Sequence, residues 1–251
     1  MIEQERHGDV LVLRLAHGKA SALDLELLEA ISSAVEAAGA GDARAIVLTG
    51  TAQIFCAGVD LVRMVKEGAD YVARFLPALD AALLAPLRCE KPVVCAINGH
   101  AIAGGAILAW TGDWRAMARG KGRIGVPELQ VGVPFPVVPL EVARAAIPRQ
   151  HERGMLLRGQ LLQAETALEH GLLDELCEPE ELLETAIARA AELGELHGPA
   201  FAATKRALHA PLLARISSLT EVQAEIARVW EQPSTLEAIA DYVERTLGKK
   251  G

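Results

Sequence analysis

The chain has 251 residues, and its 33 acidic side chains against 25 lysines and arginines give a formal net charge of −8. A chain of this length forms one large domain or two small ones, and it can bury a core without crosslinks. Its hydrophobic fraction of 51% excludes a disordered protein. The acidic balance and the aromatic content of 4% argue against a nucleic-acid binder, which needs a basic surface and stacking platforms.

The cysteines and the N-terminus carry no signal for a metal site, a disulfide framework or export. Cys56, Cys89, Cys95 and Cys177 form no CxxC pair. The N-terminal MIEQERHGDV lacks the apolar run of a signal peptide, and no apolar stretch reaches the ~18 residues of a membrane helix. We therefore expect a cytoplasmic protein that binds no metal, has no nucleic-acid partner and does not associate with membranes.

The first two thirds of the chain alternate between strand and helix patterns. Short β-rich apolar runs predict strands over Asp9–Leu15, Ala43–Leu48, Pro92–Ile97 and Trp114–Met117. Apolar residues at helical spacing predict helices over Leu23–Ala38 and Ala69–Leu87. This alternation is typical of α/β architecture.

After Ile147 the strand signal fades and helical patterns dominate. Helices are predicted over Leu161–Glu169, Glu180–Leu193, Ala200–Leu208, Leu212–Trp230 and Thr235–Leu247, with glycine or proline between them. The best boundary lies near Leu193–Pro199. The sequence thus predicts an α/β core over residues 1–194 and a C-terminal helical region over residues 195–251.

Two segments with glycine follow two of the predicted strands. The first is Ile54–Leu61 (IFCAGVDL), and the second is Asn98–Ile107 (NGHAIAGGAI). Ligands of α/β proteins bind where parallel strands end, and small residues let a substrate approach backbone N–H groups. A helix starting near Gly104 would point its positive end there, so one amide from each segment could form an oxyanion hole. Two tight turns that need glycine explain the same pattern.

These segments resemble the enoyl-CoA hydratase/isomerase, or crotonase, superfamily. Ala57–Leu61 is similar to its AGxDL signature, and Asn98–Gly105 is similar to its NGxAxGGG segment. Weaker matches lie in order along nearly the whole chain, at Ser21–Leu23, Ile124–Glu128, Ala167, Gly171–Asp174 and Thr204–Lys205.

The resemblance implies a crotonase-like spiral of ββα units with a helical C-terminal region, assembled as a homotrimer or homohexamer. It implies an acyl-CoA substrate and no cofactor, because the CoA is part of the substrate. The oxyanion donors of the family map onto the amides of Ala57 and Gly104. The CoA-binding positions map onto Ser21, Ala22, Leu23, Cys56, Ala57, Gly58, Val59, Asp60 and Gly104, and more loosely onto Lys205.

The carboxylates point to one branch of the superfamily. Its hydratases carry two glutamates, but Ile107 occupies the position of the first, and Glu128 matches the second. One carboxylate can move a proton from one carbon to another, whereas hydration needs a second group to activate water. The residues around Glu128, including Ile124–Gly125 and Gly112–Arg115, resemble isomerases that convert 3-enoyl-CoA to 2-enoyl-CoA. Glu128 is therefore the expected catalytic residue, although an acid that begins a helix would look the same.

Two alternatives remain open, and a third is less favoured. One is an enoyl-CoA hydratase, or another acyl-CoA lyase or hydrolase, whose second acid is Asp60 or Glu90. Another is a catalytically silent acyl-CoA-binding protein that keeps the oxyanion hole but has no working base. The third is nucleophilic chemistry at Cys56 with His100 as its base, which is less favoured because most buried cysteines act as small hydrophobic residues.

Overall fold

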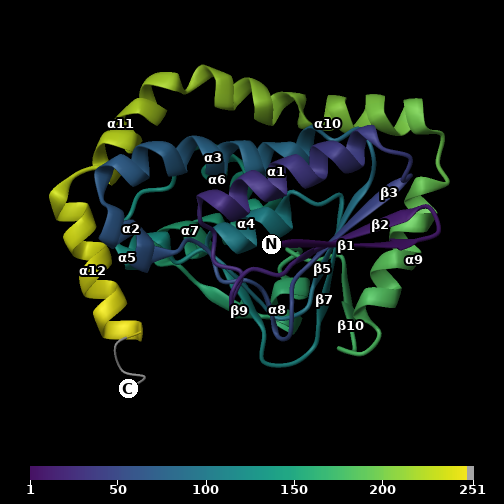
Figure 1. Ribbon diagram of the computed structural model, residues 1–251, viewed down its shortest axis with the longest axis horizontal. Coiled ribbons are helices and arrows are strands. Elements are labelled where there is room, and N and C mark those ends of the chain that lie inside the picture. The colour runs from purple at the N-terminus through teal and green to yellow at the C-terminus, as the bar shows by residue number, and fades with distance from the viewer. Residues whose placement is uncertain (248–251) are drawn as a thin grey trace.

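Residues 1–247, which the computed structural model describes, form two β-sheets and twelve α-helices (Figure 1). The larger sheet has the strand order β1-β2-β3-β5-β7-β10. Its β1–β2 pair is antiparallel and its other pairs are parallel. The strands of this sheet are β1 (Ile2–His7), β2 (Val10–Leu15), β3 (Ala45–Thr49), β5 (Val93–Ile97), β7 (Trp114–Ala118) and β10 (Glu175–Cys177).

The smaller sheet has the order β4-β6-β8-β9, and its strands are β4 (Ile54–Cys56), β6 (His100–Ile102), β8 (Arg123–Gly125) and β9 (Leu161–Gln163). Successive strand pairs, β3 with β4, β5 with β6 and β7 with β8, each give one strand to each sheet before a helix begins. This repeat winds the chain into a spiral of ββα units. The predicted fold class, α/β with a crotonase-like spiral, is confirmed.

The helices cover the sheets on more than one side. Within the first 194 residues they are α1 (Leu25–Ala40), α2 (Leu61–Glu67), α3 (Ala69–Arg88), α4 (Gly104–Trp110), α5 (Glu128–Val131), α6 (Val137–Ala146), α7 (Arg149–Arg158), α8 (Ala164–Glu169) and α9 (Leu182–Gly194). Helix α9 packs on one face of the larger sheet, through an apolar cluster that includes Ala186, Ala190 and Val47. The main core lies on the other face, where α1 packs against α3.

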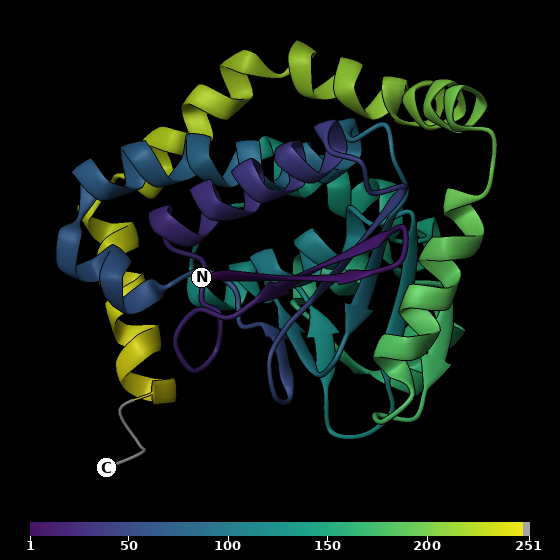
Figure 2. The same ribbon diagram turned by 45° about the vertical axis from the view of Figure 1, so that its right-hand side comes forward.

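The last three helices form an arch over this core. Helix α10 (Gly198–Ser218) runs along the top of Figure 1, and α11 (Thr220–Trp230) and α12 (Pro233–Leu247) turn down one side. Figure 2 shows the same arch from a second direction. Helix α12 packs against α2 and α5, so the C-terminal end of the described chain returns to the glycine-containing segments. The proposed boundary at residue 194 falls at the end of α9 and stays a prediction, and Gly248–Gly251 lie outside the described residues.

Several expected elements need correction. Strand β1 was not predicted, because most of its residues are exposed and polar at the edge of the sheet. The predicted helix over Leu161–Glu169 is wrong for its first three residues, which form β9, and β10 interrupts the segment expected to be free of strands. Pro211 lies inside α10 rather than between two helices. No helix among residues 1–247 is long and apolar enough to cross a membrane.

Candidate active site

The two glycine-containing segments lie side by side, because β4 and β6 pair in parallel in the smaller sheet. Gly58 has a φ of +86°, and a Cβ on it would lie 2.6 Å from the carbonyl oxygen of Ile102. A Cβ on Gly105 would lie 2.3 Å from the carbonyl oxygen of Cys56. Any larger residue at either position would push the two segments apart. These glycines are therefore required for the close approach and do more than close turns.

The amide of Ala57 is already engaged in this structure. Its N–H donates to the carbonyl of Ala20 at 3.1 Å, so it is not free to hold a substrate oxygen. Nearby, the N–H of Leu23 donates to Gly58 O at 2.7 Å, and Leu23 O accepts from the N–H of Asp60 at 3.0 Å. These two bonds make a parallel bridge in which Leu23 lies opposite Val59. In a parallel bridge of this kind, the N–H of the residue opposite points to the other side. Val59, two residues after the expected Ala57, thus presents its amide away from Leu23.

Gly104 is where α4 begins, as its sequence suggested. Its predecessor Ala103 has a φ of +54° and accepts hydrogen bonds from the N–H groups of Ala106 and Ile107. The first N–H groups of a helix have no carbonyl one turn earlier to bond. No backbone hydrogen bond among residues 1–247 uses the amide of Val59 or of Gly104. Both amides are therefore available as donors at this place.

A pocket of about 360 Å³ lies in front of these amides. Its wall comes from both segments, from the region around α5 and α6, and from the C-terminal helices. The lining residues are Ala20, Ala22, Ala57, Val59–Val62, Leu79, Ile102–Gly104, Pro127, Glu128, Val131, Val133, Pro136, Pro139, Trp230, Tyr242 and Thr246. Most of these side chains are apolar, so the pocket suits a largely apolar ligand.

Glu128 is the buried acid of this pocket. It is the first residue of the short helix α5, so the interpretation as a helix-start acid is correct in position. It is nevertheless only 8% exposed, and its Oε2 has no hydrogen-bond partner among the described residues. Burial raises the pKa of Glu128 to about 8, despite a weaker opposing effect of its own backbone N–H. A carboxyl group held in this way takes and returns a proton near neutral pH.

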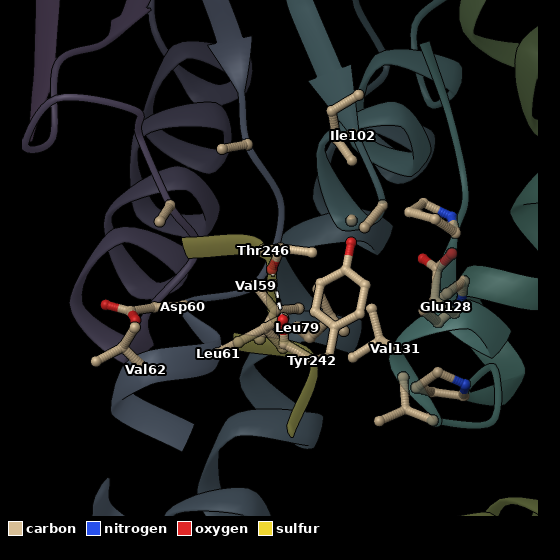
Figure 3. A pocket seen from close by; sticks show the side chains of 18 of the residues that line it. Val59, Asp60, Leu61, Val62, Leu79, Ile102, Glu128, Val131, Tyr242 and Thr246 are labelled. Carbon is tan, nitrogen blue, oxygen red and sulfur yellow. Dashed lines mark hydrogen bonds between the residues drawn. The ribbon is translucent and has the colours of Figure 1, made fainter. Parts of the chain in front are cut away.

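Three other polar groups of the lining are engaged elsewhere. Asp60 caps α2 by accepting from the N–H of Arg63, at 3.0 Å. Trp230 Nε1 donates to Pro134 O at 2.9 Å, and Thr246 Oγ1 donates to Tyr242 O at 2.6 Å. Figure 3 shows Glu128 and Tyr242 reaching into the same space from different elements. Sequence reasoning missed Trp230, Tyr242 and Thr246, because only an amphipathic pattern marks their helices.

Several predicted site residues support the pocket without lining it. Ser21 is buried, and its hydroxyl donates to Leu15 O, while the thiol of Cys56 donates to Ser21 O. Leu23 contacts Gly104, where an added Cβ would lie 2.8 Å from Leu23 Cδ1. Burial raises the pKa of Cys56 to about 12, which argues against the nucleophile considered at first.

Two further positions do not lie where the sequence suggested. The buried Lys205 is bonded to Asp113 at 2.6 Å and to Lys91 O, and it lines a different pocket beneath α10. The structure therefore does not bring Lys205 to the predicted CoA site. Ile107 is fully buried in the core and is absent from the lining of the Glu128 pocket.

The family model described as enoyl-CoA hydratase/isomerase matches residues 5–248. A probable enoyl-CoA hydratase of Mycobacterium bovis is 35% identical over 189 residues, which are 75% of this chain and 74% of that protein.

Two solved structures share the fold. The human mitochondrial delta3-delta2-enoyl-CoA isomerase has a TM-score of 0.93 at 25% identity, covering 100% of this chain and 99% of that one. A probable enoyl-CoA hydratase of Mycobacterium tuberculosis has a TM-score of 0.85 at 29% identity, covering 92% of this chain and 99% of that one. With the family model spanning nearly every residue and the two glycine segments joined at one pocket, the chain belongs to the enoyl-CoA hydratase/isomerase family.

Proposed function

We propose that this protein is an enoyl-CoA isomerase that shifts the double bond of an acyl-CoA from C3 to C2. The observation that carries the proposal is the set of carboxyl groups that line the pocket. Among the described lining residues, Glu128 is the carboxyl group with an unpartnered oxygen, and Asp60 is held as a helix cap. A reaction that moves one proton between two carbons needs one such group.

In the proposed mechanism, the thioester carbonyl accepts hydrogen bonds from the amides of Val59 and Gly104. The ionised Glu128 removes a proton from C2, and the C2–H electron pair moves toward the carbonyl, giving a dienolate. Glu128 then returns the proton to C4, and the double bond forms between C2 and C3. Amide donors fixed before the reaction stabilise the developing negative charge, and loss of one typically costs ~10²–10³ in rate.

The surroundings of Glu128 suit this reaction better than hydration. Pro127, Val131, Val133 and Pro136 surround it in an apolar lining, which disfavours a bound water molecule. The position where hydratases of the family carry another glutamate, by the sequence resemblance, holds the core residue Ile107. The likeness to the human isomerase over the whole chain supports the same choice.

Hydration is the second candidate function, because the sequence relatives are mostly described as enoyl-CoA hydratases. It requires a second group that activates water. Asp60 would have to leave the N-terminus of α2 to serve, and Glu90 lies outside the pocket. A silent acyl-CoA-binding protein is the third candidate, and the unpaired Glu128 disfavours it.

The three candidates separate in one experiment. Purified protein is mixed with a 3-enoyl-CoA or a 2-enoyl-CoA, and double-bond position and water addition are followed separately. Isomerisation without hydration is the result we expect. Water addition to the 2-enoyl-CoA would establish the hydratase, and binding without turnover would establish the silent protein.

The remaining expectations from the sequence stay predictions. They are the absence of a metal or other cofactor, a cytoplasmic location and a homotrimer or homohexamer. Exposed apolar side chains, including Leu157, Leu196 and Leu208, are consistent with surfaces covered by other subunits. Sedimentation at micromolar concentration measures the mass, and a monomer would contradict the predicted assembly.

A further inference from the structure

Tyr242 carries a hydroxyl group that the proposed mechanism does not use. Asp60, Trp230 and Thr246 bond to protein atoms, as described above. No hydrogen bond among residues 1–247 involves the hydroxyl of Tyr242. The uncommitted side chains of the lining are therefore one acid, Glu128, and one O–H donor, Tyr242.

The helix that carries Tyr242 is firmly seated. Ile239, one turn earlier on α12, is fully buried. Gly132, at the end of α5, has a φ of +97°, and a Cβ on it would lie only 2.8 Å from the Cβ of Ala238. Thr235 Oγ1 also donates to Val229 O at 2.6 Å, which fixes the turn between α11 and α12. The packing of α12 therefore fixes the position of the Tyr242 ring.

The ring is directed into the pocket. Figure 3 shows the Tyr242 ring standing between the Val59 and Leu79 side and the Glu128 side, with its hydroxyl pointing toward Ile102. Ile102 ends β6, and the chain turns at Ala103 into Gly104, whose amide is a proposed oxyanion donor. In this view the hydroxyl points toward the end of β6, two residues before the proposed donor Gly104, and Glu128 lies on another side of the ring.

We propose that the hydroxyl of Tyr242 donates a third hydrogen bond to the thioester oxygen, which strengthens as that oxygen becomes an enolate. This inference rests on the proposed function. Two amides supply neutral dipoles from the α/β core, and the phenol supplies a donor from the C-terminal arch. Hydrogen bonds to charged groups are stronger than bonds between neutral groups, so the enolate gains more than the ground state. The C-terminal helix would then complete the catalytic site as well as cover it.

The test uses acetoacetyl-CoA, a thioester whose enolate absorbs in the near ultraviolet. On binding, Glu128 takes the C2 proton and the electron pair moves to the oxygen, so the spectrum reports the ratio of enolate to keto form without any isomerisation. For Tyr242→Phe we expect this ratio to fall about tenfold or more, while total binding changes little. An unchanged ratio would overturn the inference, and so would a wild-type protein that holds no enolate.

The other tyrosine provides a matched control. Tyr71 lies outside the pocket, and its hydroxyl accepts from the N–H of Leu25 at 3.2 Å. Tyr71→Phe also deletes one hydroxyl, but from a ring that is buried in the core. It should therefore lower the thermal midpoint and leave the enolate ratio unchanged. Loss of enolate in both variants would assign the effect to stability and overturn the inference.

A second measurement does not depend on deleting the hydroxyl. The chain has two tyrosines, so in a Tyr71→Phe background 3-fluorotyrosine enters at position 242 alone. The fluorinated phenol is the stronger acid and the stronger donor, so the enolate ratio should rise. A purely structural ring would give no change. Failure of the proposed function would be seen separately. In that case the wild-type protein would form the enolate of acetoacetyl-CoA but would not isomerise a 3-enoyl-CoA.

Discussion

Two pockets of this protein contain buried ionisable side chains, and the two side chains have opposite surroundings. Beneath α10, Lys205 is 4% exposed and its ammonium bonds to Asp113 at 2.6 Å and to Lys91 O. Beneath α12, Glu128 is 8% exposed and its Oε2 has no partner among the described residues. Removing one partner of a buried ion pair is costly, whereas the Glu128 carboxyl, which has no cation partner within residues 1–247, holds its proton up to a pKa of about 8.

The two ends of the C-terminal arch differ in the same way. Helix α10 supplies Lys205 to an ion pair with the core, and Asp113 also accepts from the N–H of Val93. Helix α12 supplies Tyr242, whose hydroxyl is uncommitted. One end of the arch is therefore anchored by polar contacts, and the other end contributes the Tyr242 hydroxyl to the lining of the Glu128 pocket.

The largest expected effect is on catalysis by Glu128→Gln. The amide keeps the shape of the side chain but cannot accept the C2 proton, and a positioned base typically contributes ~10²–10⁴-fold. We expect at least that loss in kcat for isomerisation of a 3-enoyl-CoA, with acyl-CoA affinity nearly unchanged. Full activity in this variant would show that Glu128 only begins a helix and that another group is the base.

The next effect concerns the paired charge. Lys205→Met leaves the partly buried Asp113 without its cation. Breaking a buried pair typically costs about 3–5 kcal/mol of folding free energy, and we expect a loss toward the lower end of that range. Denaturant unfolding measures this loss. Acyl-CoA affinity of the folded protein should not change, because Lys205 lies outside the Glu128 pocket. Weaker acyl-CoA binding with intact stability would instead restore the CoA contact expected from the sequence.

The pH dependence of the reaction follows from the raised pKa of Glu128, about 8. The base must be ionised to accept a proton, so raising the pH activates it. We expect kcat/KM to rise about tenfold per pH unit below that pKa and to level off above it. A rate that is flat from pH 6 to pH 9 would contradict the assignment of Glu128 as the base.

The same pKa predicts an effect on stability with the opposite sign to that of Lys205→Met. The folded state holds the Glu128 proton up to about pH 8, whereas an unfolded chain releases it near 4.5. Below pH 4.5 both states are protonated, and as the pH rises toward 8 the wild type loses stability by about 1.4 kcal/mol per pH unit. Glu128→Gln should therefore gain in thermal midpoint over the wild type between pH 6 and pH 8. A constant difference between the thermal midpoints of the variant and the wild type across that range would show that Glu128 is already ionised in the folded protein.

The long apolar strands and the position of Glu128 were predictable from the sequence. Strands β3 and β5 are continuous apolar runs, because both faces are covered. The strands of the smaller sheet have three residues each, which is too short for any alternation to appear. The resemblance to a family placed Glu128, Val59 and Gly104 in the pocket, since local motifs carry them.

What the sequence did not predict depends on contacts between distant segments. Ala57 was the expected oxyanion donor, but its amide donates to Ala20 O, whereas the amide of Val59 has no backbone partner among the described residues and is the donor that we propose. Tyr242 follows Glu128 by more than a hundred residues and lines the same pocket only because α12 folds back on α2 and α5. The pattern of α12 indicates an apolar face but not the surface that the face covers.

The most direct test of the account follows a label through the reaction. A 3-enoyl-CoA carrying deuterium at C2 is incubated with the protein in ordinary water, and the 2-enoyl-CoA product is examined by nuclear magnetic resonance. If Glu128 carries one proton within an apolar pocket, part of the product must contain deuterium at C4. A product with no deuterium at C4, or one to which water has been added, would contradict the single-carboxylate isomerase.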